Sequence, residues 1–167
     1  MLVGVSKDHV GKLLMYRSEN LLDWTAMGVA FEEPNAWMLE CPDFYELDGK
    51  EVLTFSPVGI KGEYSTYLIG HMDYEKGQFQ FESRGILDYG VDFYAPQTFL
   101  TPEGERYVIG WQNGWEWMDE WNGFGELTEN SWCGAMSIPR KIKLKDNRLQ
   151  SVLPNKVSTL KAAKTVI

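Results

Sequence analysis

The sequence has few of the residues that bind metals or form covalent cross-links. Its 167 residues include two cysteines, Cys41 and Cys133, and two histidines, His9 and His71. The cysteines lie far apart without a CxxC spacing, and the histidines are isolated, so neither pair has the spacing of a metal-ligand motif. We therefore expect no structural metal and no disulfide framework.

Positive charge and long apolar segments are also scarce. Lys and Arg number 16 against 24 Asp and Glu, which gives a net charge of −8 and a pI near 4.8. This balance disfavours binding to phosphate backbones or anionic lipids, so neither nucleic acid nor a membrane is an expected partner. The N-terminal residues lack the pattern of a signal peptide, and nowhere do 18 apolar residues follow one another. We expect a soluble protein in the cytoplasm.

Helix signals are nearly absent, because apolar residues rarely recur at helical spacing without an intervening Gly, Pro or run of β-formers. Short runs of β-forming residues dominate instead, and five of them are residues 12–16, 51–55, 65–69, 79–81 and 106–109. Turn chemistry separates these runs at Asp48-Gly49, Lys76-Gly77, Pro102-Glu103-Gly104 and Asp146-Asn147. The pattern predicts an all-β chain of hairpins in antiparallel sheets.

One segment of the chain is repeated. Residues 41–55 align with residues 95–109, with a one-residue difference at the turn, and Pro42 and Pro96 mark equivalent positions 54 residues apart. Hairpin cassettes that repeat at roughly this interval are typical of β-propeller blades, in which each sheet packs against its neighbours. A β-sandwich would also produce short strands and turns, but it gives no reason for a repeated cassette.

Several motifs resemble glycoside hydrolase family 32, the β-fructosidases of the invertase and sucrose-6-phosphate hydrolase type. Trp37-Met-Leu-Glu-Cys-Pro-Asp43 resembles the family's WECPD signature. The further matches, in chain order, are Tyr16-Arg-Ser-Glu-Asn-Leu-Leu-Asp-Trp24, Phe44 to Pro57, Asp88-Tyr-Gly-Val-Asp-Phe-Tyr-Ala-Pro-Gln-Thr-Phe99, Ile109-Gly-Trp111 and Trp132-Cys-Gly-Ala-Met-Ser-Ile-Pro-Arg140. Several motifs in the family's order are far more specific than any one of them.

The resemblance implies a five-bladed β-propeller that is usually followed by a β-sandwich. Family members also carry a WMNDPNG-like segment with the nucleophilic Asp and an RDP segment, and neither string occurs in this sequence. The family's PRE motif reads Pro139-Arg-Lys141 here, which puts the role of its acidic residue in doubt. We interpret residues 1–167 as a partial catalytic propeller domain that lacks the N-terminal blade, the C-terminal sandwich and the nucleophile.

Glu40 is the predicted acid/base catalyst. Retaining hydrolysis needs a nucleophilic carboxylate and a second carboxyl about 5 Å away, which first protonates the leaving oxygen and then activates water. The neighbours of Glu40 from Trp37 to Pro42 are largely apolar, a setting that would favour the protonated form of a carboxyl. The alternative is a solvated strand carboxylate, the commoner fate of a Glu. The resemblance favours the catalytic role.

Six further residues are predicted to bind substrate, each with a structural alternative. By resemblance, Cys41 contacts the sugar beside the catalytic acid, although a free Cys is more often a small buried hydrophobe. Asp43 supports the site from behind or caps its own strand, with equal weight on both. Asp88 bonds hydroxyls of the sugar next to the fructose, although an Asp before Tyr89-Gly90 commonly serves a turn.

The other three predicted binding residues are Tyr94, Gln97 and Trp111, at one end of inner strands that face a propeller's channel. Trp111 stacks on a sugar by resemblance, or else fills an interface between blades. A long segment rich in tryptophan and acidic residues carries specificity or packs on its own aromatics; its residues are Trp115, Glu116, Trp117, Asp119, Glu120 and Trp121.

The predicted function is retaining hydrolysis of terminal β-D-fructofuranosides such as sucrose, sucrose 6-phosphate or short fructans. The expected partner is a small fructose-containing sugar, and the complete enzyme is expected to need no cofactor, neither metal nor nucleotide. One alternative is a catalytically inactive, carbohydrate-binding propeller fragment. Another is the inverting chemistry of a related five-bladed glycosidase family, which the Glu40-Cys-Pro-Asp43 motif disfavours. The sequence predicts no oligomeric state.

Overall fold

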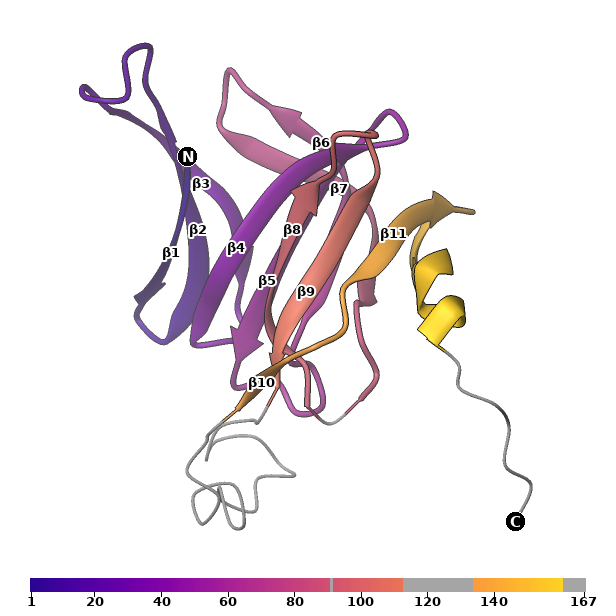
Figure 1. The fold of residues 1–167 in the computed structure, drawn as a ribbon. Coiled ribbons are helices and arrows are strands. Elements are labelled where there is room, and N and C mark those ends of the chain that lie inside the picture. Colours follow the sequence, from indigo (N-terminus) through magenta and orange to yellow (C-terminus); the bar gives the residue numbers. More distant parts are fainter. Residues whose placement is uncertain (91, 113–133, 161–167) are drawn as a thin grey trace.

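The structure is a computed structural model, and it describes residues 1–90, 92–112 and 134–160. The described residues form three antiparallel sheets that follow one another in chain order (Figure 1). The first sheet has the order β1-β2-β3, formed by β1 (Leu2–Lys7), β2 (Val10–Arg17) and β3 (Thr25–Glu33). The all-β prediction agrees with this arrangement, and the helix described is a single 3₁₀ helix, η1 (Asn155–Leu160).

The second sheet has four strands in the order β4-β5-β6-β7. Its strands are β4 (Met38–Leu47), β5 (Lys50–Val58), β6 (Thr66–Asp73) and β7 (Gln78–Ile86). Each strand pairs with the next one along the chain, so the sheet is a simple meander of hairpins. It lies between the other two sheets, because β1 and β3 contact β4 and β7 on one side, while β8 and β12 contact the same two strands on the other.

The third sheet is built around β9. Its strands are β8 (Tyr94–Leu100), β9 (Arg106–Gln112), β10 (Ala135–Met136), β11 (Arg140–Lys145) and β12 (Arg148–Val152). Both β10 and β11 pair with β9, at its C-terminal and N-terminal ends respectively, so together they act as one interrupted strand. Ser137 bridges the interruption: its N–H donates to Gly110 O at 2.8 Å, and its Oγ accepts from Gly110 N at 3.0 Å.

The tight turns follow the predicted turn chemistry. Asp48 and Gly49 have φ values of 50° and 77°, and Asp146 and Asn147 have values of 51° and 57°. Two successive residues with positive φ match the right-handed twist of the flanking strands, which is why such pairs close two-residue hairpins. The β1-β2 hairpin uses the same device at Asp8-His9, a turn that the sequence did not predict.

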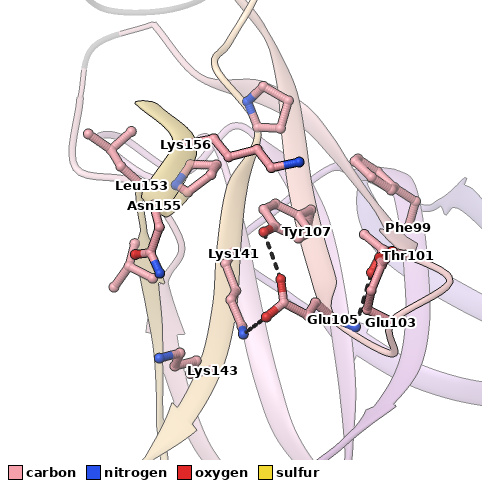
Figure 2. Close-up of a pocket in the computed structure, with 13 residues that line it drawn as sticks. Phe99, Thr101, Glu103, Glu105, Tyr107, Lys141, Lys143, Leu153, Asn155 and Lys156 are labelled. Carbon is pink, nitrogen blue, oxygen red and sulfur yellow. Dashed lines mark hydrogen bonds and ion pairs between the residues drawn. The ribbon is translucent and has the colours of Figure 1, made fainter. Parts of the chain in front are cut away.

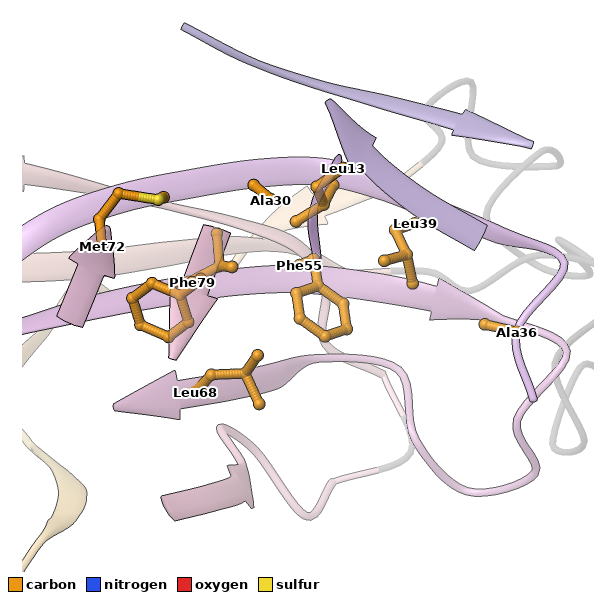
Figure 3. Close-up of a cluster of buried hydrophobic side chains, with 9 residues drawn as sticks. Leu13, Ala30, Ala36, Leu39, Phe55, Leu68, Met72 and Phe79 are labelled. Atoms are coloured by element: carbon orange, nitrogen blue, oxygen red, sulfur yellow. The ribbon is translucent and has the colours of Figure 1, made fainter. Parts of the chain in front are cut away.

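Two apolar cores hold the three sheets together. Nine buried side chains fill the core between the first and second sheets (Figure 3): Leu13, Ala30, Ala36, Leu39, Leu53, Phe55, Leu68, Met72 and Phe79. The sheets approach closely at Gly4, where an added Cβ would lie 2.0 Å from the Leu39 carbonyl oxygen. The second core joins the second and third sheets and includes Val52, Ile69 and Val108. Each sheet therefore buries a face against its neighbour, as propeller blades do.

The repeated cassette corresponds to the first two strands of the second and third sheets. Both β4 and β8 contain a bulge, because the pairing register shifts between Glu40 and Asp43 in one and between Tyr94 and Gln97 in the other. Cys41 and Ala95 have the same φ of 49° at equivalent positions of the two bulges. Bulges re-aim the side chains beside them. The repeat read from the sequence is thus a repeat of backbone geometry.

Candidate active site

The bulge in β4 places Glu40 at the edge of the second sheet that meets the third. Glu40 pairs with Ser56 of β5 and is the last paired residue before the bulge. The following Cys41-Pro42 pair has no direct partner in that register, and the positive φ of Cys41 turns the strand. A left-handed conformation at a non-glycine residue costs roughly 1–2 kcal/mol, so surrounding contacts hold it in place.

Tyr94 supplies a hydrogen bond to Glu40 from the neighbouring sheet. Its hydroxyl donates a hydrogen bond to Glu40 Oε2. Glu40 and Tyr94 occupy equivalent positions in the two repeats. Tyr94 is 4% exposed, and burial, followed by the bond to the Glu40 carboxylate, raises the pKa of its phenol far above the usual value. The phenol therefore keeps its proton at neutral pH and acts as the donor. Glu40 itself is half-buried.

Ser56 connects the two bulges, because it contacts a residue of each. It is fully buried opposite Glu40, and its Oγ accepts a hydrogen bond from the backbone N–H of Ala95 at 3.0 Å. This bond fixes the residue after Tyr94 and so helps to aim the phenol. The sequence did not single out Ser56, although it belongs to the Phe44–Pro57 stretch that resembles the family.

Cys41 and Gln97 meet across the same junction. The Gln97 Nε2 donates to the backbone oxygens of Cys41 and Pro96, each at 3.0 Å, so this exposed side chain braces the first bulge. Cys41 is exposed, yet loss of water around the sulfur and then the adjacent Glu40 carboxylate raise the pKa of its thiol. A protonated thiol is a poor nucleophile.

Asp43 joins β4 to β8. Its Oδ2 accepts from Thr98 N at 2.7 Å and from Thr98 Oγ1 at 2.6 Å. Arg106 Nη1 donates to the same threonine hydroxyl at 2.9 Å. These bonds hold the inner strands β4 and β8 together.

Trp111 packs beside the Glu40–Tyr94 pair. It is half-buried at the C-terminal end of β9 and contacts a small cluster that contains Tyr64, Tyr94 and Ala95. Its ring passes over Gly134, where an added Cβ would lie 2.1 Å from the indole. Trp111 therefore packs against Tyr94, the residue whose phenol binds Glu40.

Asp88 lies in a neighbouring cavity of about 430 Å³ that Phe93, Ser137 and Arg140 also line. Asp88 forms an ion pair with Arg140. Arg140 lies over the ring of Phe93, the residue that precedes Tyr94 in the sequence. The structure thus gathers six of the seven predicted residues around one junction of sheets and places the seventh beside them. Arg140 and Ser56 were not predicted as site residues.

A larger cavity, of about 640 Å³, lies on the outer face of the third sheet (Figure 2). Phe99 and Tyr107 stack at its wall, and Glu105 binds both Lys141 and the Tyr107 hydroxyl. None of the seven predicted site residues lines it. The predicted tryptophan-rich segment from Trp115 to Trp121, like Trp132 and Cys133, lies outside the described residues.

In residues 1–90, 92–112 and 134–160, no three His, Cys, Asp or Glu side chains gather in a way that could hold a metal ion. Across the same ranges, no helix has the length and apolar character needed to cross a bilayer.

Comparison with known proteins gives a consistent result. The glycosyl hydrolases family 32 N-terminal domain matches residues 1–153. The sucrose-6-phosphate hydrolase of Zymomonas mobilis is 36% identical over 170 aligned residues, which cover 89% of this chain and 32% of the relative. The chain spans about a third of the length of the curated relatives that it matches.

Solved structures agree with the sequence matches. The β-fructofuranosidase of Bombyx mori superposes with a TM-score of 0.85 at 33% identity, covering 96% of this chain and 36% of the enzyme, and a variant of that enzyme has been solved in complex with sucrose. These matches confirm that the three sheets are β-propeller blades. The chain belongs to family 32 of the glycosyl hydrolases.

Proposed function

We propose that the complete protein hydrolyses terminal β-D-fructofuranosides with retention of configuration, and that Glu40 is its acid/base catalyst. The observation that carries this proposal is the bond from the Tyr94 phenol to a half-buried Glu40 at the bulge of an inner strand. A carboxyl held by a neutral donor can release and regain a proton without breaking an ion pair. The names of the relatives, sucrose-6-phosphate hydrolase and β-fructofuranosidase, support a fructose-containing sugar as the substrate.

The proposed reaction has two steps. In the first, protonated Glu40 gives its proton to the glycosidic oxygen while a nucleophilic carboxylate attacks the anomeric carbon and the leaving sugar departs. In the second, the Glu40 carboxylate takes a proton from water, which attacks the fructosyl-enzyme and releases fructose. We propose that the nucleophile comes from a part of the protein outside these 167 residues, because the sequence contains no WMNDPNG-like segment.

The remaining predicted residues would support these steps. Tyr94 orients Glu40, Trp111 backs the phenol, and Cys41 and Gln97 form the rim of the bulge that the sugar would meet. Asp88 would bind hydroxyls of the sugar that leaves. Asp43 would act from behind, through Thr98. We further propose that residues 1–167 form part of a single catalytic domain and that the protein works in the cytoplasm.

A second candidate function is sugar binding without hydrolysis. The names of the relatives, which are hydrolases, do not favour it. The two functions make different predictions for the full-length protein, because only hydrolysis releases fructose.

The test is release of fructose from sucrose and sucrose 6-phosphate, followed with the configuration of the released sugar by NMR. We expect the full-length protein to release fructose that is initially the β-anomer, and the 167-residue chain to release none. Initial α-anomer would refute the retaining mechanism. A full-length protein that binds sucrose but releases no fructose would replace hydrolysis by the binding function.

A further inference from the structure

Tyr64 is a buried tyrosine in the loop between β5 and β6, and none of the predicted roles includes it. The loop consists of residues 59–65. Tyr64 is 7% exposed and packs in one apolar cluster with Tyr94 and Trp111. The Tyr94 phenol in turn donates a hydrogen bond to Glu40. Tyr64 therefore packs against the residue that holds the proposed catalytic carboxyl.

The residue before Tyr64 anchors the loop to the second sheet. Glu63 Oε2 accepts a hydrogen bond from the hydroxyl of the buried Thr66 at 3.0 Å, and it pairs with Arg84 Nη2 at 2.7 Å. Arg84 lies on β7, and its other terminal nitrogen binds Glu33 of the first sheet. The loop is thus tied to the outer strand of its own sheet and, through Arg84, to the neighbouring sheet.

The residue after Tyr64 is anchored as well. Ser65 is fully buried, and its carbonyl oxygen accepts a hydrogen bond from the backbone N–H of Leu87 at 2.9 Å. Leu87 directly follows β7 and belongs to the second core. Bonds on both neighbours restrict the backbone of Tyr64, so the direction of its ring is set by the fold. Side chains supported in this way can hold a functional group in a defined geometry.

Tyr94 depends on support of this kind. Its hydroxyl lies at the end of a side chain with two rotatable bonds, so contacts along the ring decide where the hydroxyl points. The backbone beside it is fixed by the bond from Ala95 N–H to Ser56 Oγ at 3.0 Å. The ring itself is held by packing with Tyr64 and Trp111. A closely packed ring has little room for another orientation.

We propose that Tyr64 is a positioning residue whose ring holds the Tyr94 phenol in line with Glu40, so that the Glu40 carboxyl points at the glycosidic oxygen. The inference rests on the proposed hydrolysis and extends it to a residue that acts through Tyr94. Two consequences follow from this indirect action. Tyr64 affects the steps in which Glu40 transfers a proton, and its effect disappears when the Tyr94 hydroxyl is removed.

The first test compares two substrates in the full-length protein. The leaving sugar of sucrose needs a proton, whereas the nitrophenolate of p-nitrophenyl β-D-fructofuranoside departs without one. Tyr64→Leu should lower kcat for sucrose about tenfold, because the smaller side chain leaves space into which the phenol can turn. The nitrophenolate burst should change by less than about threefold, since that step needs no proton from Glu40.

The second test repeats the change in a Tyr94→Phe background. Tyr94→Phe removes the hydroxyl that Tyr64 is proposed to aim. Adding Tyr64→Leu should therefore lower kcat for sucrose by less than about a further twofold, because both changes disrupt one arrangement.

The matched control is Tyr67→Leu. Tyr67 is 5% exposed and thus as deeply buried as Tyr64, but it lies on β6 in the second core. Tyr67→Leu should leave kcat for sucrose within about twofold. Thermal unfolding of each variant shows whether it is folded. If Tyr64→Leu does not fold, Tyr64→Met takes its place with the same expected results, because a flexible methionine fills irregular gaps.

An unchanged kcat for sucrose in the Tyr64 variant would overturn the proposal. Equal losses on sucrose and in the nitrophenolate burst, or losses that multiply in the double variant, would also overturn it. A loss of the same size in Tyr67→Leu would show that any loosening of the core lowers turnover, which contradicts a specific role of Tyr64. Failure of the unmutated protein to cleave either substrate would instead refute the proposed hydrolysis.

Discussion

Two carboxylates lie at junctions between neighbouring blades, and their partners differ. Glu33 on β3 is buried where the first sheet meets the second, and it binds the Arg84 guanidinium of β7. Glu40 on β4 is half-buried where the second sheet meets the third, and it accepts from the Tyr94 phenol of β8. One carboxylate is paired with a cation and the other with a neutral donor.

The partners decide what each carboxylate can do. Burial alone would raise the pKa of Glu33, but the hydrogen bonds from Arg84 and Asn35, together with the charge of Arg84, lower it overall. Arg84 also binds Glu63, so the three residues form an ion-pair network. A carboxylate in such a network is poorly suited to give up or take a proton, whereas a carboxylate bonded to a phenol stays available for proton transfer.

The largest expected effect comes from exchanging Gln for each carboxylate in the full-length protein. Glu40→Gln should lower turnover of sucrose by at least about 100-fold, the scale of lost general acid/base help, and change the free energy of unfolding by less than about 1 kcal/mol. Glu33→Gln should leave turnover within about threefold and lower the free energy of unfolding by about 1–2 kcal/mol. A sucrose assay and denaturant unfolding measure both. Loss of activity in Glu33→Gln alone would reverse the assignment.

The second prediction removes the neutral donor. Tyr94→Phe should lower kcat for sucrose about tenfold, because Glu40 loses the hydrogen bond that orients its carboxyl. Tyr74→Phe is the control, since the Tyr74 phenol donates to Glu51 away from the site. Initial rates on sucrose measure both variants. An unchanged kcat in Tyr94→Phe would show that the phenol does not act on the catalytic group.

The third prediction concerns the ion-paired carboxylate and acid. The folded state lowers the pKa of Glu33 below its ordinary value of 4.5, so its contribution to stability is present above that pH and is lost as the pH falls through the lowered value. The difference in unfolding free energy between the unmutated protein and Glu33→Gln should therefore shrink as the pH falls from about 7 to about 3. A difference that grows in acid would contradict the sign.

The smallest effect tests the backbone that the two repeats share. Ala95→Gly removes a left-handed alanine, so it should leave stability unchanged or raise it by up to about 1 kcal/mol. Ala26→Gly, near the start of β3 and outside the positive-φ residues, should cost about 0.5–1 kcal/mol. Thermal unfolding of the two variants gives the comparison. Equal losses would mean that the bulge stores no strain at Ala95.

The sequence predicted the elements whose signals are local. Asp48-Gly49 and Asp146-Asn147 predicted the hairpin turns correctly, because those residues tolerate positive φ. The Asp8-His9 turn was not predicted, because it contains none of the Gly, Pro or Asn residues that mark turns most strongly. The interruption between β10 and β11 depends on the bond of Ser137 with Gly110, a contact between residues 27 positions apart that no local pattern encodes.

The sequence predicted which residues lie at the site but not how they contact one another. The family motifs named Glu40, Tyr94 and Asp88. The repeat gave the spacing of Glu40 and Tyr94 but not the hydrogen bond between them. The pairing of Asp88 with Arg140 spans 52 residues, and Arg140 had appeared in the sequence only as part of a motif. Packing of one sheet on another determines such pairs, and periodicity within a strand carries no information about them.

The role of Glu40 as proton donor is tested by the dependence of the rate on the leaving group. In the full-length protein, p-nitrophenyl β-D-fructofuranoside releases a nitrophenolate that departs without a proton, so the first step should no longer need an acid. We expect the nitrophenolate burst of Glu40→Gln to be slowed by less than about tenfold, although the same variant loses at least about 100-fold on sucrose. Equal losses on both substrates would contradict the account, because Glu40 would then not be the proton donor.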